Sequence, residues 1–580
     1  MYIDSILNGS TITTWARNET QELVEFTTDA PYYYYEETPN DTGMTTIFGD
    51  FVEKKEFASR ADMTFARANT MKAIHESDIS PLYKFLSDTF HDRKNKNLHI
   101  GYFDIEVDFD LSDGIGYPTP DNPYGEINSV SLFNAVTQEY HMVVLDRRSA
   151  HNIKLSDADH PVHVHECVTE RQLLTVFIDL IEDIDVLSAW NGDFYDIPYI
   201  VLRCIKYWGE SQGRKMLCRG GFPAERMMKR DAYDNEVLYF ELVGRVHLDM
   251  MKVYKNSTFG ERPSYRLDAI CEHEKIGRKI DYKGDLGELY RTDPQRFFDY
   301  SLHDSRLMKD LDEKMGIIEL SIIRAQASTI RYTDIYGSIK PLEMKIRNYV
   351  HYERSEPMVL PDKEDNHKES FDGAFVIPTH QSIFGWSSSI DLEGLYPSVM
   401  RTINISPDTH LFQCMDDKVD FVKVVERSND PITVMDVQTK RKLTTTGDSL
   451  MSLIKAEGLT ISAYGSVFAA KKGLLPEVLD LWVTTRKESK AKMFEYQDLY
   501  NNTSEKETTI RAELKDKIDF FNTKQLLAKL DNNSLYGAVS NPYCRFYTIH
   551  CAASVTSTGQ IIEKHQIANS DRILDSVANG

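Results

Sequence analysis

Two acidic residues on one short strand are the first feature of this 580-residue sequence that could do chemistry. In the run FDIEV, Asp104 and Glu106 stand two positions apart, so on a β-strand both side chains project from the same face. Phe103, Ile105 and Val107 would then face an apolar core. Such carboxylates can hold a hard divalent cation, although a half-exposed strand with a polar wet side would show the same pattern.

Two later segments supply further acidic groups. In SAWNGDFYDIPYI, Asp196 precedes an apolar helical run, where it would also serve simply as a helix cap. In FFDYSLHDSRLMKDL, Tyr300 and Asp304 are four positions apart and share one face of a helix, as residues on a solvated face also would. Each segment taken alone therefore has a purely structural explanation.

The second half of the sequence holds two more such patterns. In SSSIDLEGLYPSVMRTINISP, Asp391 falls where an apolar strand-like run gives way to a turn, and a Gly- and Pro-containing turn is the alternative reading. In KQLLAKLDNNSLYGAVS, Gln525, Lys529, Asn533 and Tyr536 recur at spacings of four, four and three and line one helix face. An exposed polar stripe would look the same.

Two cations lie on the helical run before this stripe. Arg486 and Lys490 are four positions apart, and a like-charged pair at this spacing costs stability unless an anion lies between them. A triphosphate is a natural candidate for that anion, whereas a solvated basic face is the alternative.

The surrounding patterns predict the elements that position these residues. Strands alternate with helical stretches from Leu98 to about Asp334, beginning with HIGYFDIEV and ending in a helix, which fits an α/β nuclease-sized domain. The polar stretch ERSEPMVLPDKEDNHKES predicts a connection between domains. An antiparallel helical hairpin is predicted from two consecutive helical runs, PEVLDLWVTTRKESKAKMFEYQDLY and the following run that ends at Tyr536.

Length and composition set broad limits. At about 150 residues per domain, the chain should form roughly four domains. We find no apolar run of membrane-spanning length and no secretory signal, so a cytoplasmic protein is expected.

The seven cysteines form no CxxC pair, which argues against a zinc site or a disulfide framework. The net charge of −23 disfavours nucleic acid as a partner only weakly, because a locally basic groove is sufficient.

Together, in this order and spacing, the three acidic segments resemble the Exo I, Exo II and Exo III motifs of the DEDDy proofreading exonucleases of family B DNA polymerases. The two later segments resemble motif A, DxxSLYPS, and motif B, KxxxNSLYG, of the same family. Taken together, the five segments resemble the replicative polymerases of T-even-type bacteriophages, and this resemblance extends over the whole chain. Asn191 keeps its usual position, but Tyr195 replaces a Phe and Gly394 replaces a Ser.

The resemblance implies a role for each acidic residue of the nuclease segments. Asp104, Glu106, Asp196 and Asp304 would bind two Mg²⁺ or Mn²⁺ ions, and Tyr300 would orient the attacking water. A pair of ions about 4 Å apart stabilises both the attacking and the leaving oxygen. Without metal, some of these acids should have raised pKa values because like charges disfavour ionisation.

The resemblance also implies a nucleotide site with two ions, in which Asp391 and the Leu392 carbonyl bind metal. Leu395 and Tyr396 would shape the pocket, with the Tyr396 ring excluding a 2′-hydroxyl. The remaining implied contacts are with the triphosphate or the base pair and involve Arg486, Lys490, Lys529, Asn533 and Tyr536.

The expected fold is a multidomain mixture of α/β and α+β domains. The expected parts are a mixed N-terminal domain over 1–97 completed by 335–370, an RNase H-like exonuclease domain over 98–334, a partial ferredoxin-like palm over 371–465 and 541–580, and helical-hairpin fingers over 466–540.

One acidic motif of the family was not found. Motif C is a DTD-type hairpin that follows motif B, and the nearest candidate, RILDSVANG, contains Asp575 but predicts a helix. We therefore expect a second polypeptide that carries motif C and the thumb, and a sliding clamp bound through that partner. The expected substrates are primer–template DNA, single-stranded DNA 3′ ends and dNTPs, in the cytoplasm of an infected bacterium. A stand-alone exonuclease and a noncatalytic relic are the alternatives.

Overall fold

The computed structural model describes residues 1–93, 98–110, 116–147, 153–230, 236–258, 260–282, 284–365, 370–376 and 391–579. The chain forms two compact units, each a mixture of helices and strands. The first consists of Met1–Tyr32 and Ser80–Gly337, and the second of Tyr33–Ile79 and Ser338–Gly580.

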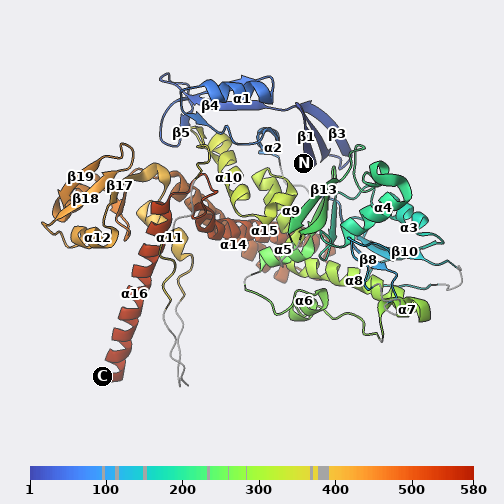
Figure 1. The fold of residues 1–580 in the computed structure, drawn as a ribbon. Coiled ribbons are helices and arrows are strands. Elements are labelled where there is room, and N and C mark those ends of the chain that lie inside the picture. The colour runs from blue at the N-terminus through green and yellow to red at the C-terminus, as the bar shows by residue number, and fades with distance from the viewer. Residues whose placement is uncertain are drawn as a thin grey trace. The chain divides into compact units, whose positions relative to one another are not determined.

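A six-stranded sheet organises the first unit (Figure 1). Its order is β11-β10-β9-β8-β12-β15, and β9 runs antiparallel to both of its neighbours whereas the remaining pairs are parallel. The strands are β8 (Ile100–Val107), β9 (Ile127–Asn134), β10 (Glu139–Leu145), β11 (Val162–Cys167), β12 (Val186–Ala189) and β15 (Val246–Asp249). The strand expected from HIGYFDIEV is therefore confirmed as β8.

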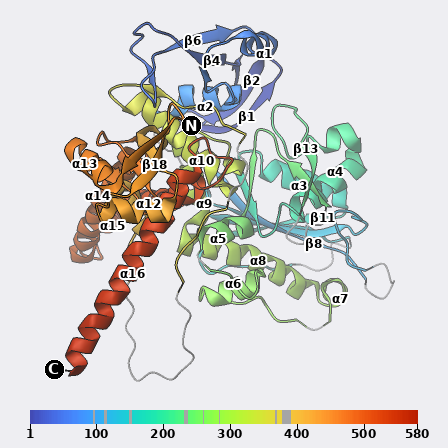
Figure 2. The ribbon, with the colours of Figure 1, turned by 60° about the vertical axis from the view of Figure 1, so that its left-hand side comes forward.

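Helices cover both faces of this sheet (Figures 1 and 2). On one face, Ile105 joins a buried core with Leu174 and Phe177 of α3 (Glu170–Leu180). On the other face lies α8 (Pro294–Met315), where Asp312 accepts a 2.5 Å hydrogen bond from the Tyr102 hydroxyl. Alternate residues of β8 thus face an apolar core and the helix α8, as the period of two along a strand requires.

The other elements of this unit surround the sheet. They are β1 (Tyr2–Asn8), β2 (Thr11–Arg17), β3 (Leu23–Asp29), α2 (Pro81–Phe90), α4 (Asp196–Gly213), β13 (Glu225–Arg230), β14 (Glu236–Glu241), α5 (Met250–Ser257), α6 (Leu267–His273), α7 (Leu286–Thr292) and α9 (Ile317–Ser328). Gly316 ends α8 in the left-handed conformation at φ 62, which glycine adopts without strain.

The second unit contains a five-stranded sheet, β19-β18-β17-β21-β20, and long helices. The strands of the whole unit, including the five of this sheet, are β4 (Tyr32–Glu37), β5 (Thr45–Thr46), β6 (Val52–Phe57), β7 (Ile74–His75), β16 (Met358–Val359), β17 (His410–Cys414), β18 (Pro431–Asp436), β19 (Lys442–Thr446), β20 (Thr460–Ile461) and β21 (Ser466–Phe468). Its helices are α1 (Arg60–Asn69), α10 (Ile339–Asn348), α11 (Leu395–Ile403), α12 (Asp417–Val425), α13 (Gly447–Glu457), α14 (Leu474–Asn502), α15 (Thr508–Val539) and α16 (Ile549–Asn579).

The helices α14 and α15 form the expected hairpin. They pack along each other, and the rings of Tyr496 and Phe521 stack between them at 5.6 Å. At their other end, Leu479, Leu535 and Val539 join the main core of the unit. Most of the buried residues of the hairpin lie at this end, and the opposite end is largely exposed to solvent.

Four further expectations concern two single segments, the cysteines and membrane-spanning helices. The helix predicted near Asp575 is confirmed, since α16 extends to Asn579, although the Asp575 side chain lies outside the described residues. The strand expected before Asp391 also lies outside them. All seven cysteines are free, and no helix in the described ranges has the length and hydropathy needed to span a bilayer.

Candidate active site

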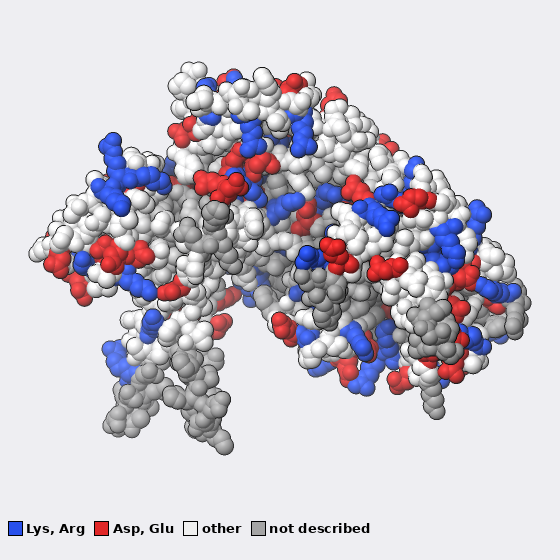
Figure 3. All heavy atoms as spheres, viewed as in Figure 1, with Lys and Arg blue, Asp and Glu red and all other residues white. Residues whose placement is uncertain are grey.

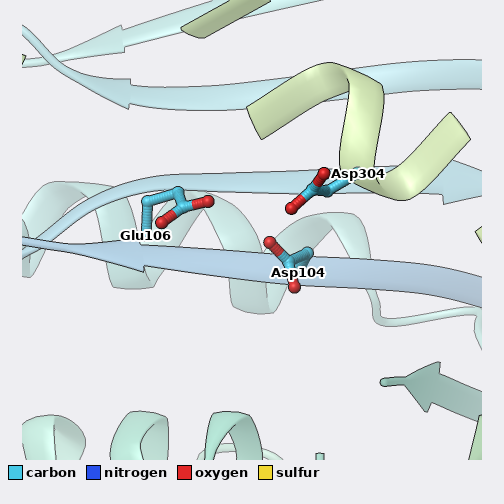
Figure 4. A group of neighbouring side chains, drawn as sticks. All are labelled: Asp104, Glu106 and Asp304. Atoms are coloured by element: carbon cyan, nitrogen blue, oxygen red, sulfur yellow. The ribbon is translucent and has the colours of Figure 1, made fainter. Parts of the chain in front are cut away.

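Three carboxylates converge above the sheet of the first unit (Figure 4). Asp104 and Glu106 project from β8, and Asp304 descends from α8 to meet them. One carboxylate oxygen of each lies within 4.8 Å of the others. Side chains separated by some 200 positions in the chain thus share one small volume.

Asp196 lies beside this group without being part of its tightest core. It is the first residue of α4, after Tyr195, and its Oδ1 accepts a hydrogen bond from the Ile105 backbone N–H at 3.3 Å. Its charge is close enough to raise the pKa of Asp104. All four acids named from the sequence therefore lie around one point, carried by β8, α4 and α8.

The electrostatics of the group follow mainly from burial. Burial, and then the negative charge of Asp304, raises the pKa of Glu106 to about 8. Burial also raises the pKa of Asp196 to about 7, and it raises that of Asp104 well above its usual range. The raised pKa values expected from the sequence are confirmed, but desolvation contributes more than the like charges.

The group fits a divalent cation. Asp304 is buried, and its Oδ1 atom has no hydrogen-bond partner. Carboxylate oxygens are the ligands that hard Mg²⁺ and Mn²⁺ ions prefer, and a buried acceptor without a donor is costly. Within the described ranges, Asp104, Glu106 and Asp304 are the only three potential ligand residues that approach one another this closely.

Sequence reasoning missed a cation at this site. The Lys279 ammonium forms an ion pair with Asp304 and donates a 3.0 Å hydrogen bond to the Tyr300 hydroxyl oxygen. Burial alone would lower the pKa of Lys279, but the negative charge of Asp304 outweighs burial and raises this pKa, so the side chain is cationic. Lys279 comes from the segment between α6 and α7, and no periodicity or spacing in RKIDY marks it.

Exposed aromatic rings border the acids. Tyr117 stacks on Tyr195 at 6.0 Å, and the Tyr195 hydroxyl lies 3.0 Å from that of Tyr117. On another side, Tyr282 meets the Tyr300 ring edge to face at 5.3 Å. Tyr117 is 49% exposed and Tyr282 36%, so both side chains are partly accessible next to the carboxylates.

The second unit holds the other candidate residues. Asp391 and Leu392 are exposed just before α11, and Gly394 begins this helix with φ 64. That conformation is strained for residues other than glycine, which accounts for Gly394 locally. The rings of Tyr396 on α11 and Tyr536 on α15 lie 4.6 Å apart. The segments that carry Asp391 and Asn533 therefore meet through two tyrosines.

The candidate phosphate-binding cations lie on the helical hairpin. Arg486 on α14 donates a 3.0 Å hydrogen bond to Glu393, which is itself highly exposed. Lys490 on α14 and Asn533 on α15 are exposed, and Lys529 on α15 is half-buried. Arg486 thus meets an acid from the Asp391 segment where a phosphate was expected.

Comparison with known proteins agrees with both halves of this description. Residues 63–270 match the model of the family B DNA polymerase exonuclease domain, and residues 347–577 match that of DNA polymerase family B. The chain belongs to the family B DNA polymerases. The exonuclease match includes Asp104, Glu106 and Asp196, and the polymerase match includes every candidate from Asp391 to Tyr536.

Two phage proteins resemble this polymerase chain over most of its length. The DNA-directed DNA polymerase of Enterobacteria phage T4 is 24% identical over 536 residues, which cover 85% of this chain and 57% of the phage protein. That of Escherichia phage RB69 is 24% identical over 560 residues, covering 89% and 60%. A DNA polymerase of Pyrococcus glycovorans is 28% identical over 277 residues, 46% of this chain. The chain spans less than two thirds of either phage polymerase.

Proposed function

We propose that the first unit is a 3′→5′ exonuclease that removes nucleotides from single-stranded DNA 3′ ends. The observation that carries this proposal is the meeting of Asp104, Glu106 and Asp304 within 4.8 Å, with Asp196 beside them. The Asp304 oxygen without a hydrogen-bond partner also favours a cation at this point.

Each side chain has a defined task in this proposal. Asp104, Glu106, Asp196 and Asp304 hold two Mg²⁺ or Mn²⁺ ions, which when bound activate water and neutralise the phosphate. Tyr300 positions the attacking water through its hydroxyl, and Lys279 places a positive charge beside it. The exposed Tyr117 and Tyr282 rings support the terminal bases by stacking.

The test is degradation of a labelled single-stranded oligonucleotide in Mg²⁺. Changing Asp104 and Glu106 together to Ala should abolish degradation, because both are ligands in the proposal. Asp310→Asn is the matched control, since Asp310 lies on α8, the helix of Asp304, and pairs with Lys309 instead. Unchanged degradation by the double variant would overturn the assignment.

We propose that the second unit contributes part of a templated DNA polymerase. Asp391 and the Leu392 carbonyl bind metal, Leu395 and Tyr396 shape the nucleotide pocket, and Tyr536 lies by the templating base pair. Arg486, Lys490 and Lys529 bind the triphosphate, with Asn533 nearby.

The surface charge of the protein is compatible with DNA binding. Figure 3 shows Lys and Arg interspersed with Asp and Glu on the described surface of one face, so local basic contacts with DNA remain available despite the net charge of −23.

The domain boundaries belong to the same proposal. We assign 98–334 to an RNase H-like exonuclease, 371–465 and 541–580 to a ferredoxin-like palm, and 466–540 to the fingers. The N-terminal domain is 1–97 with 335–370. The packing of α14 against α15 supports the fingers assignment.

Synthesis by this site needs another carboxylate. No DTD sequence follows Tyr536 within these 580 residues, and Asp391 alone cannot hold two ions at a productive separation. We propose that a second polypeptide supplies motif C and the thumb, and that a sliding clamp binds through it.

Reconstitution tests this arrangement. Primer extension should require the chain together with a polypeptide that carries motif C, and Asp391→Asn should abolish extension while leaving exonuclease activity intact. Extension by the chain alone would contradict the partner proposal. Normal extension by the Asp391→Asn complex would contradict the motif A assignment.

A stand-alone exonuclease is the second candidate function. It is favoured by a contrast between the two sites. The nuclease acids Asp104, Glu106 and Asp304 converge, whereas Asp391 belongs to no group of three potential metal ligands in the described part of the chain. Exonuclease activity without extension under any combination of partners would select this alternative.

A further inference from the structure

Three histidines lie together at the edge of the six-stranded sheet, away from the acids of the exonuclease site. His141 belongs to β10, and His163 and His165 belong to β11, which is the edge strand. In this parallel pair His141 stands opposite His163, and Val143 stands opposite His165. All three imidazoles therefore project from the same face of the sheet.

The rings are in close contact. The His141 and His163 ring centroids are 5.3 Å apart, those of His141 and His165 are 5.5 Å apart, and both pairs are stacked. The His141 Nδ1 and His165 Nε2 atoms lie only 3.2 Å from each other. Glu139, on the same face of β10, places a carboxylate oxygen 3.4 Å from the His163 Nε2 atom.

The position of the cluster on the sheet makes it both rigid and accessible. Val143 and Cys167, the next residues on this face, belong to the buried core that includes α3. His141 and His165 are half-buried and His163 is exposed, so the histidines form the rim of that core. Continuous β-pairing from Tyr140 to Leu145 fixes the backbone beneath them.

The protonation state suits a metal ligand. Burial and the neighbouring imidazoles lower the pKa of both His141 and His165. Both rings are therefore neutral near pH 7, and a neutral imidazole is the form that binds metal. Three cationic rings in these positions would repel one another.

We propose that His141 and His165 form a transition-metal site that joins β10 to β11, with His163 and water completing the coordination. Two nitrogens bound to one tetrahedral ion at 2.0–2.1 Å stand about 3.3 Å apart, close to the 3.2 Å separation here. His163 reaches the ion after its ring turns away from Glu139. Imidazole favours Zn²⁺, Cu²⁺ and Ni²⁺ over Mg²⁺, so the site is chemically distinct from the carboxylate cluster.

Such an ion would act on the edge of the sheet. β11 has a neighbour on one side only within the described sheet, and edge strands are the easiest to detach. An ion bound only by the native arrangement stabilises the folded protein by mass action. The site would therefore hold the edge strand in register independently of exonuclease chemistry.

Copper titration of the full chain tests the proposal, because Cu²⁺ spectra report the ligand atoms directly. One equivalent of Cu²⁺ should give electron paramagnetic resonance lines split by at least two imidazole nitrogens. His141→Gln and His165→Gln should each weaken this binding at least tenfold, and His163→Gln should weaken it less. His273→Gln, an exposed histidine on α6, is the matched control and should bind as the unaltered protein does.

Thermal unfolding supplies a second readout. Zn²⁺ should raise the melting temperature of the unaltered protein and of His273→Gln, but not that of His141→Gln/His165→Gln. Melting in a chelator shows whether the variants fold, and Mg²⁺-dependent exonuclease activity should be unchanged in them. The proposal would be overturned by copper signals that show oxygen ligands only, or by equal copper affinity in the His141→Gln and His273→Gln variants. The contact between His141 and His165 would then be a hydrogen bond that shares one proton between the two rings.

Discussion

The Lys279 ammonium donates a hydrogen bond to the Tyr300 phenol oxygen at 3.0 Å. A protonated lysine has no acceptor, so in this contact the phenol oxygen can only accept. The Tyr300 hydroxyl hydrogen must therefore point to another acceptor, such as the Asp304 carboxylate or a water in the site. One loop lysine thus sets the direction in which the tyrosine donates.

Changing Lys279 to Met should lower the exonuclease turnover rate by about 10²–10³-fold, the scale of one preorganised electrostatic contribution, because the change removes the positive charge beside the attacking water and the hydrogen bond that orients Tyr300. Single-turnover degradation of a labelled strand measures this rate. Lys279→Arg keeps the charge and should retain part of the activity. Full activity in Lys279→Met would show that the lysine merely balances Asp304 when no ion is bound.

Mg²⁺ affinity should rise with pH between about 6 and 8.5. Glu106, with a pKa of about 8, and Asp196, with a pKa of about 7, are partly protonated in this range and must lose their protons to bind metal. Affinity should increase up to about tenfold per pH unit for each proton released. Calorimetry in buffers of different ionisation enthalpy measures both quantities, and a flat profile without proton release would contradict the raised pKa values.

Glu106→Gln should stabilise the metal-free protein at pH 8. The folded pKa of Glu106 is raised from 4.5 to about 8, so without metal the carboxyl lowers stability progressively as pH rises through that window. Removing this cost should raise the melting temperature in EDTA by about 2 °C or more. The difference should vanish near pH 4.5. It should reverse in saturating Mg²⁺, which only the unaltered site binds fully.

Tyr396→Ala should let the reconstituted polymerase accept ribonucleotides. The Tyr396 ring is held against Tyr536 at 4.6 Å, so it forms a firm wall where the proposal places the sugar. We expect discrimination against ribonucleotides, measured as a ratio of kcat/KM values, to fall at least about tenfold, equivalent to about 1.4 kcal/mol. Tyr396→Phe keeps the ring and should keep the discrimination. Equal ratios in the Ala and Phe variants would remove Tyr396 from this role.

Glu393→Gln should lower the KM for dNTPs in the same complex. Glu393 pairs with Arg486 at 3.0 Å, and an incoming triphosphate must displace it from the arginine. An exposed ion pair contributes about 0.2–1 kcal/mol, so the KM should fall by no more than about fivefold. Steady-state incorporation kinetics test this, with Glu488→Gln on α14 as the control. An unchanged KM would mean that the pair does not compete with nucleotide.

The sequence alone was sufficient for the local geometry of the acids. A period of two placed Asp104 and Glu106 on one face of β8, and a spacing of four placed Tyr300 and Asp304 on one face of α8, because these periods are properties of the backbone itself. The hairpin of α14 and α15 followed from helical periodicity for the same reason. The motif order then identified the family.

Only the tertiary structure decided which side chains from distant segments contact one another. Lys279 reaches Asp304 from a loop without any pattern, and Arg486 finds Glu393 from a separate segment. The pairing register of β10 with β11 brings His141 to His165. Local spacing carries no information on such contacts, since packing and strand register between distant segments determine them. Burial, which raises the pKa of Glu106 more than any neighbouring charge does, likewise exists only once the fold has closed over the site.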